Sequence, residues 1–292
     1  MRENTSDKTF AFLSKMADEW GISPLERVTT PVFIGGIPRS GTTACNILLQ
    51  QALSGKPAPQ APMPESFFWE SGRDPDNVDF MRSKIAYLGG TTAYVDFYNH
   101  VVGRGHAWSR TVGFPDLCEL YFALGKQRWQ LKEALEKTPS NALFADQIFE
   151  VFPAALLIVM IRHPYAVYCS MLKRAADEPD AAWLNMDVEQ FSWFYKFYVD
   201  AAHQARTKYG DRVLLCKFED VVINSEKILS FVDRGIDQHK IRPVSKNPVH
   251  PGASIEEYFE ILEPQAGLVK QILGETIEYL NYPANVGGAE LL

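Results

Sequence analysis

The chain has 292 residues, of which 46% are hydrophobic and 22% are charged, and its formal net charge is -7. This composition is typical of a globular protein with a sizeable core, and it excludes wholesale disorder. The negative charge argues against a general nucleic-acid or anionic-membrane surface, because such surfaces need a basic face. The N-terminus has no apolar run that resembles a signal peptide, and the longest apolar run, "PAALLIVMI" at 153–161, is too short to cross a bilayer. We therefore expect a soluble, cytoplasmic protein without membrane or nucleic-acid partners.

The cysteines and histidines do not show the spacing of a metal site. His100 and His106 are six positions apart and do not share one helix turn, so we predict that the protein binds no metal. We interpret the cysteines as reduced, mostly buried thiols. They are widely separated along the chain: Cys45, Cys118, Cys169 and Cys216.

Helical and strand patterns alternate along the chain. The spacing predicts a first helix over 8–20, and a β-rich run over 31–36 leads through a glycine-rich loop into a helix that ends at Gly55. Residues 79–135 are predicted to be mainly helical, and their glycine-rich interruptions indicate a helical lid or substrate region at about 66–135. The later predicted elements are a strand over 155–161, helices over 164–176 and 187–208, a strand over 211–222, and helices over 225–233 and 264–281.

This alternation predicts the fold class and the place of the site. Strands that alternate with helices form right-handed crossovers, so we expect an α/β protein with a central parallel sheet flanked by helices, in a single domain over 1–292. Ligands of such sheets bind beyond the carboxyl ends of the strands. The segments "GGIPRSGTT" and "RHPYAVYCS" are both expected at that edge.

The segment "GIPRSGTT", residues 36–43, is typical of a phosphate-binding loop. Backbone amides of a glycine-rich turn converge on an anion, and the following helix N-terminus adds a partial positive charge. Thr42 stands where a nucleoside triphosphatase has lysine, and Arg39 is the cation within the loop. The pattern therefore favours a ligand with fewer phosphates and no metal, with a triphosphatase or a turn without any ligand as the alternatives.

The two segments together resemble the phosphate motifs of sulfotransferases that use 3'-phosphoadenosine 5'-phosphosulfate (PAPS). "GIPRSGTT" resembles their 5'-phosphosulfate loop, and "RHPYAVYCS" resembles their 3'-phosphate motif, with Arg162 and Ser170 at the family's spacing of eight residues. "EKTP" at 136–139 and "KFEDVV" at 217–222 resemble two further family segments. The resemblance spans 31–281 and implies a three-layer, P-loop-like fold. PAPS carries two separate anionic ends, which agrees with two anion sites.

The resemblance implies roles for several residues. It implies that Arg39 and Lys137 stabilise charge on the sulfuryl oxygens and the leaving phosphate, and that no metal is needed. Glu65 is the candidate base, because the tyrosylprotein branch places its glutamate in a similar context; His106 or His100 is the alternative, and a helix-capping role for Glu65 also stays open. The implied cofactor-binding residues are Arg39, Ser40, Gly41, Thr42, Thr43, Arg162, Ser170, Phe218, Lys246 and Ser254.

The chain departs from the family pattern at two places. Phe218 replaces a tyrosine, which leaves a ring for the adenine but removes a hydroxyl. The segment after 241 lacks the basic-glycine cluster of cytosolic members, so Arg242, Lys246 and Ser254 are candidates only.

The expected activity is transfer of a sulfuryl group from PAPS to a hydroxyl, with adenosine 3',5'-bisphosphate (PAP) as product. A small-molecule acceptor is favoured over a protein. The alternatives are a P-loop kinase or triphosphatase and a nucleotide-binding protein without activity. The aromatic runs "FFW", near the expected mouth of the loop, and "WFYKFY" are candidates to line an acceptor pocket for an apolar alcohol or phenol. The helical set at 191–198 is more typical of a helix core, so the sequence does not identify the acceptor. It does not indicate an oligomeric state either.

Overall fold

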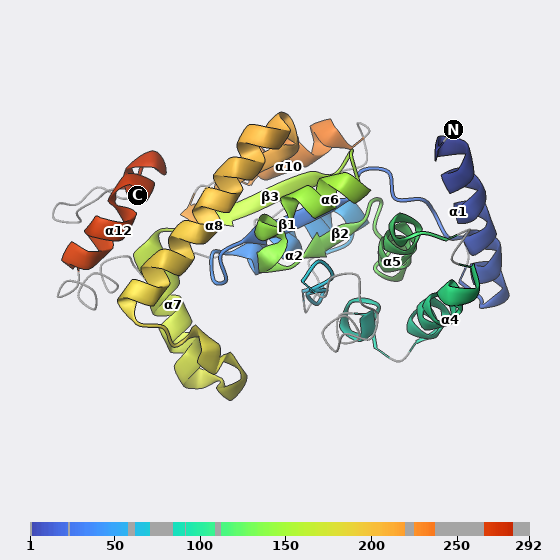
Figure 1. The fold of residues 1–292 in the computed structure, drawn as a ribbon, viewed down its shortest axis with the longest axis horizontal. Helices are drawn as coiled ribbons and strands as arrows, with labels where there is room; N and C mark the ends of the chain where they lie inside the picture. The colour runs from blue at the N-terminus through green and yellow to red at the C-terminus, as the bar shows by residue number, and fades with distance from the viewer. Residues whose placement is uncertain are drawn as a thin grey trace.

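A four-stranded parallel sheet forms the centre of the protein (Figure 1). The computed structural model describes residues 2–22, 24–57, 62–70, 84–90, 92–108, 112–219, 225–236 and 266–282. The strands lie in the order β2-β1-β3-β4, and each neighbouring pair is parallel. Their bounds are Val32–Gly36 for β1, Leu135–Lys137 for β2, Leu156–Ile161 for β3 and Val213–Lys217 for β4. The predicted α/β fold with a central parallel sheet flanked by helices is confirmed.

Helices fill the chain between and after the strands. Helices α2, α8 and α10 contact the strands and cover the sheet, while α12 packs along α8. The described α-helices are α1 (Arg2–Glu19), α2 (Thr42–Ser54), α4 (Ala93–Trp108), α5 (Phe114–Arg128), α6 (Ala145–Val151), α7 (Pro164–Asp177), α8 (Val188–Tyr209), α10 (Glu226–Gly235) and α12 (Ala266–Tyr279). Short 3-10 turns lie at η1 (Pro139–Leu143), η2 (Pro179–Leu184) and η3 (Gly210–Arg212).

The local signals in the sequence explain most of these boundaries. Gly55 adopts a left-handed conformation with φ 65° and ends α2, as the sequence predicts. Pro164 occupies the first turn of α7, and Asp187 caps α8 through the Gln190 amide. The predicted apolar stripe of α8 is buried: Val188, Phe191, Tyr195, Tyr198 and Ala202. The four cysteines are also buried.

The structure differs from the predicted elements most clearly at three places. β2 was not expected, because "LEK" is three residues long and carries two charges, which gives no strand periodicity. Its burial comes from pairing with β1. The predicted strand over 211–222 is shorter, since β4 ends at Lys217 and residues 218–219 are helical. The first helix, predicted over 8–20, begins earlier, at Arg2.

The helical region predicted as a lid lies to one side of the sheet. Helices α4 and α5 contact each other, and α5 contacts α1. In Figure 1 these three helices occupy the opposite end of the molecule from α7 and α12. The lid role of residues 66–135 stays a prediction. None of the described helices is long and apolar enough to cross a membrane.

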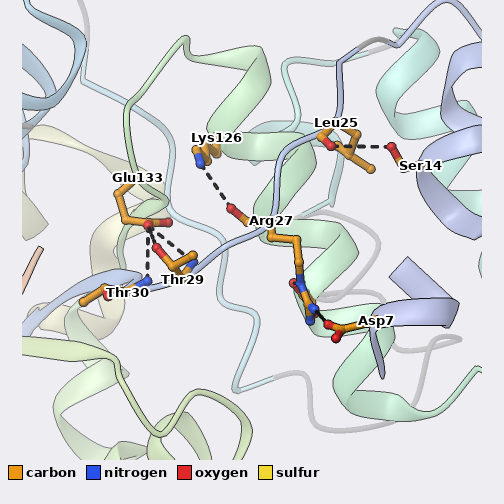
Figure 2. A network of polar contacts seen from close by, with 9 residues as sticks. Asp7, Ser14, Leu25, Arg27, Thr29, Thr30, Lys126 and Glu133 are labelled. Carbon is orange, nitrogen blue, oxygen red and sulfur yellow. Dashed lines mark hydrogen bonds and ion pairs between the residues drawn. The ribbon is translucent and has the colours of Figure 1, made fainter. Parts of the chain in front are cut away.

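A polar network attaches the segment before β1 to α5 and β2 (Figure 2). Arg27 pairs with Asp7 of α1 and, at 2.7 Å, with Glu119 of α5, while Lys126 Nζ donates to the Arg27 carbonyl at 3.1 Å. Glu133 is fully buried. It accepts hydrogen bonds from the Thr29 hydroxyl at 2.6 Å, from the amides of Thr29 and Thr30 at 3.3 and 3.2 Å, and from the Ala134 amide at 2.9 Å. This network fixes where β1 starts.

Replacement of Glu133 by alanine should lower the free energy of unfolding by about 2–4 kcal/mol, because several buried donors lose a charged acceptor. Chemical denaturation measures the change. Glu26→Ala is the matched control, since Glu26 forms an ion pair with Lys126 at 3.1 Å but its side chain is 67% exposed. The Glu26→Ala control should change the free energy of unfolding by less than about 1 kcal/mol. Equal losses in the two variants would contradict the role of Glu133.

Candidate functional site

A cavity of about 910 Å³ opens at the carboxyl edge of the sheet. The loops that follow β1, β2 and β3 supply residues to its wall, as expected for a parallel α/β sheet. The wall also includes the end of α7, η2 and one side of α8. The predicted site residues that line it are Glu65, Arg39, Gly41, Thr42, Thr43, Arg162, Ser170 and Phe218.

The loop between β1 and α2 is shaped by two glycines. Gly36 has φ 137°, and a Cβ there would lie 2.2 Å from the Met160 carbonyl of β3. Gly41 has φ 94°, and a Cβ there would lie 2.2 Å from the Phe218 ring. Both positions therefore require glycine, since the backbone is left-handed and the neighbouring atoms leave no room. Arg39 also has a positive φ, of 75°.

The N-terminus of α2 faces the cavity with unused amide donors. The first backbone bond of the helix runs from the Cys45 amide to the Gly41 carbonyl at 3.1 Å. The amides of Thr42, Thr43 and Ala44 precede it, and all three residues line the cavity. Gly41, at the N-cap, offers no side chain to cap them. The helix end and its dipole are thus available to an anion.

Three arginines meet at this wall. Arg39 Nε donates to Ser170 Oγ at 3.0 Å, and Arg162 Nη1 lies 3.4 Å from the Arg39 carbonyl. Burial, together with the positive charges of Arg174 and Arg162, lowers the pKa of Arg39, and Glu178 opposes the shift. Arg174 itself pairs with Glu178 at 2.5 Å. The predicted 5'-phosphosulfate loop and 3'-phosphate motif are therefore in direct contact, in a region of concentrated positive charge.

Arg162 is fixed from two sides. Its guanidinium carbon lies 4.8 Å from the centroid of the Phe218 ring, and its carbonyl accepts a hydrogen bond from the Tyr195 hydroxyl at 2.8 Å. The Phe218 ring lies between Gly41 and Arg162, and it is only 8% exposed. A cation stacked on a ring loses little freedom when it binds an anion.

Glu65 lines the cavity and forms an ion pair with Lys137, which is not among the residues of the cavity wall. Lys137 ends β2 and its side chain is 5% exposed, whereas the Glu65 side chain is 30% exposed. The sequence predicted both residues separately, and the fold brings them together across 72 positions of the chain. The pair places a carboxylate and an ammonium group side by side.

A buried clamp holds the backbone on both sides of this pair. Thr138 Oγ1 accepts hydrogen bonds from the amides of Ser66 and Phe67, each at 3.1 Å. Glu136 accepts from the Ser66 amide at 3.1 Å, from Thr138 Oγ1 at 2.5 Å and from Asn141 Nδ2 at 2.6 Å. Burial raises the pKa of Glu136, and the hydrogen bonds from Thr138, Asn141 and Ser66 oppose that rise. Since Glu136 and Thr138 flank Lys137, and Ser66 follows Glu65, the clamp fixes the ion pair.

Other predicted residues lie elsewhere. Ser40 is fully buried and its amide donates to the Ile37 carbonyl at 3.0 Å, so it closes the turn and does not line the cavity. The His100 ring lies 5.3 Å from the Trp20 ring, also away from the cavity wall. His106 falls in α4, but its side chain is outside the described residues, as are Arg242, Lys246 and Ser254 in full. The described residues contain no group of three or more His, Cys, Asp or Glu that could hold a metal ion.

Sequence reasoning missed Arg174 as a member of the cavity wall. Arg174 lies four residues after Ser170 on α7, so helical spacing alone could have placed it on the same face. The aromatic run "FFW" was expected near the mouth of the loop, but the sequence did not show that Phe67 lines the cavity while Phe68 and Trp69 enter the core. The clamp residues Glu136 and Thr138 were part of a quoted motif, but their partner Ser66 is distant in the sequence.

The model of the sulfotransferase family matches residues 31–232. No curated protein sequence gives a significant match.

Three solved structures to which the chain is similar are also sulfotransferases by name. The sulfotransferase domain from the curacin biosynthetic pathway is 14% identical, with a TM-score of 0.49, and the match covers 88% of this chain and 99% of that chain. The sulfotransferase domain of the Synechococcus PCC 7002 olefin synthase is 21% identical, with a TM-score of 0.44 and coverage of 74% and 76%. Sulfotransferase STF9 from Mycobacterium avium is 16% identical, with a TM-score of 0.46 and coverage of 94% and 82%.

The matched range contains all the strands of the described sheet, both arginine-bearing loops and the Glu65–Lys137 pair. The chain belongs to the sulfotransferase family.

Proposed function

We propose that this protein transfers a sulfuryl group from PAPS to a hydroxyl of a small-molecule acceptor. The observation that supports the proposal most strongly is the contact of Arg39 with Ser170, which joins two anion-binding segments at one cavity. One nucleotide with two separated anionic groups, such as PAPS, fits this arrangement. The cavity also offers suitable hydrogen-bond donors, because backbone amides and guanidinium groups both donate to phosphate oxygens.

The donor's 5' end is assigned to the β1–α2 loop. The amides of Thr42 and Thr43, with their hydroxyls, would hold the 5'-phosphate at the helix N-terminus. Gly41 has no side chain, so the backbone of the loop could approach the 5'-phosphate closely. Arg39 would neutralise charge near the sulfuryl group, and Ser40 would act by shaping the turn through its bond to Ile37.

The donor's 3'-phosphate is assigned to Arg162 and Ser170, with Arg174 as a further cation. All three line the cavity, and Ser170 and Arg174 are on consecutive turns of α7. Phe218 offers a ring edge for the adenine beside Arg162. Lys246 and Ser254 keep their predicted role as additional contacts to this phosphate.

The Glu65–Lys137 pair is assigned to the chemical step. PAPS supplies an activated sulfuryl group, which passes to the acceptor oxygen by in-line displacement with PAP as the leaving group. Glu65 would take the proton of the acceptor hydroxyl. The Lys137 ammonium has three donors, so it can hold Glu65 and also donate to an oxygen that gains charge. His106 is the alternative base.

A kinase or triphosphatase is less well supported. Thr42 occupies the place of the expected lysine. A triphosphatase also needs a carboxylate for magnesium near the end of a strand. Glu219 follows β4, but it accepts hydrogen bonds from the His163 amide at 3.0 Å and the Tyr282 hydroxyl at 2.8 Å. Both of its oxygens are thus used within the protein.

PAP without metal should raise the melting temperature of the protein, while ATP with magnesium should not. A thermal-shift comparison at equal nucleotide concentrations measures this, because a ligand that binds only the folded state stabilises it. Stabilisation by ATP with magnesium, without a shift from PAP, would contradict the proposal. Transfer of label from radioactive PAPS then separates an enzyme from a protein that only binds the nucleotide.

Arg162→Ala should weaken PAP binding by about 1.5–3 kcal/mol, because a charge-assisted contact to phosphate is lost. Isothermal titration calorimetry gives the affinity. Arg212→Ala is the control, since Arg212 also stacks on a phenylalanine, with its guanidinium carbon 4.6 Å from the Phe149 ring, but does not line the cavity. If both variants bind PAP like the unmodified protein, Arg162 does not contact the phosphate.

Glu65→Gln should lower kcat by roughly 100-fold or more while PAP affinity stays unchanged, because the isosteric amide cannot accept the acceptor's proton. Initial rates of transfer from labelled PAPS, together with calorimetry, measure the two quantities. Full activity of this variant would assign the base to a histidine instead, and His106→Gln would then be the variant that loses activity.

A further inference from the structure

Phe67 has a backbone conformation that is rare for an aromatic residue. Its φ is 49°, in the left-handed region, where bulky side chains are seldom found. The two aromatic residues that follow it are buried in the core, since Phe68 and Trp69 are 1% and 6% exposed. Phe67 instead lines the cavity. Strained conformations of this kind persist where the surrounding structure enforces them, and they concentrate at functional sites.

The enforcing group is Thr138. Its side-chain oxygen accepts hydrogen bonds from the amides of both Ser66 and Phe67, and the residue is 1% exposed. Glu136 binds the same threonine oxygen at 2.5 Å. The conformation of Phe67 is therefore set by the clamp that also fixes Glu65 and Lys137. The backbone at Phe67 is therefore held in a fixed place relative to the proposed base.

Other apolar side chains also line the cavity. Ile47 of α2 and Phe194 and Tyr198 of α8 all line the cavity, and the rings of Phe194 and Tyr198 have centroids 5.0 Å apart. Burial, and then the negative charges of Glu70 and Glu65, raise the pKa of Tyr198, so its phenol stays neutral. The arginines that suit the donor's phosphates come from the β1–α2 loop, the β3–α7 loop and α7.

We propose that Phe67, with Ile47, Phe194 and Tyr198, forms an apolar subsite that selects a neutral alcohol or phenol on a hydrophobic skeleton as the acceptor. This inference rests on the proposed sulfuryl transfer and specifies its substrate class. An apolar ring next to Glu65 would hold the acceptor by burial of its carbon skeleton while the hydroxyl reaches the carboxylate. Glu65 and Glu70, both in the cavity wall, would repel anionic acceptors.

The test compares apolar and polar acceptors on the 292-residue protein, and 1-octanol and methyl glucoside form the pair in which both hydroxyls are aliphatic. Initial rates with labelled PAPS are measured for 2-naphthol and 1-octanol and, as the polar counterpart, methyl glucoside. Calorimetry of 2-naphthol binding to the complex with PAP provides a readout that does not depend on turnover. We expect transfer to the apolar alcohols, with a KM at least roughly tenfold below that for methyl glucoside.

Two variants examine Phe67 itself. Phe67→Gly and Phe67→Asn both remove the ring but tolerate a positive φ, so the backbone is kept. Each should raise the KM and the dissociation constant for 2-naphthol roughly tenfold or more, with PAP affinity and melting temperature nearly unchanged. Phe12→Ala is the control, because Phe12 lies on α1, is 48% exposed and does not line the cavity.

The outcomes separate the two proposals. Failure of the unmodified protein to bind PAP would contradict sulfuryl transfer from PAPS. Binding of PAP with better transfer to methyl glucoside than to the apolar alcohols, or with no transfer to the apolar alcohols, would overturn the acceptor inference alone. An unchanged KM for 2-naphthol in both Phe67 variants would likewise overturn it.

Discussion

The packing of three arginines into one cavity wall is the constraint on which the site depends. Burial is the main cause that lowers the pKa of Arg39, and repulsion by the positive charges of Arg174 and Arg162 adds to it. Glu178 opposes this shift and also pairs with Arg174. Repulsion of this kind is relieved by a bound anion, and burial makes that relief stronger than at a solvated surface. The fold tolerates the arrangement because the backbone around it is fixed by other interactions.

Those other interactions begin at the sheet. Gly36 lies against β3 so closely that no side chain would fit, and Gly41 makes room for Phe218, on which Arg162 stacks. On the opposite side of β1, Asn141 links Glu136 to the Ile34 carbonyl at 3.0 Å, so the clamp behind Glu65 is attached to the strand that carries the phosphate loop. The arginine-bearing loop after β1 and the Glu65–Lys137 pair are therefore held to a common strand. A fixed relation between two such sides favours transfer between bound groups.

The sequence was sufficient to predict the parts of the site whose chemistry is local. A strand, a glycine-rich turn and a helix are recognisable from composition and spacing, which explains why α2, α7 and the two loops were expected at one edge of a parallel sheet. The pairing of Glu65 with Lys137 could not be read in this way, because it depends on β2, a strand of three residues without periodicity. The strand exists through its hydrogen bonds to β1 and its burial, both of which are tertiary.

Phe67 shows the same limit more sharply. In sequence it belongs to the run "SFFW", whose neighbours enter the core, and nothing in the run distinguishes it. Its position in the cavity wall depends on the hydrogen bond from its amide to Thr138, 71 positions away. Ser40 is the opposite case, since it stands within the phosphate loop but is turned inward and shapes the turn. Position within a motif therefore predicted the loop correctly but not the orientation of every residue in it.

The central claim is that the two anion sites bind the two phosphates of one nucleotide. Calorimetric affinities of the unmodified protein for PAP, adenosine 5'-monophosphate and adenosine 3'-monophosphate test it most directly. Each phosphate should contribute a charge-assisted interaction, so PAP should bind at least roughly tenfold more tightly than either monophosphate. An affinity for either monophosphate equal to that for PAP would contradict the claim.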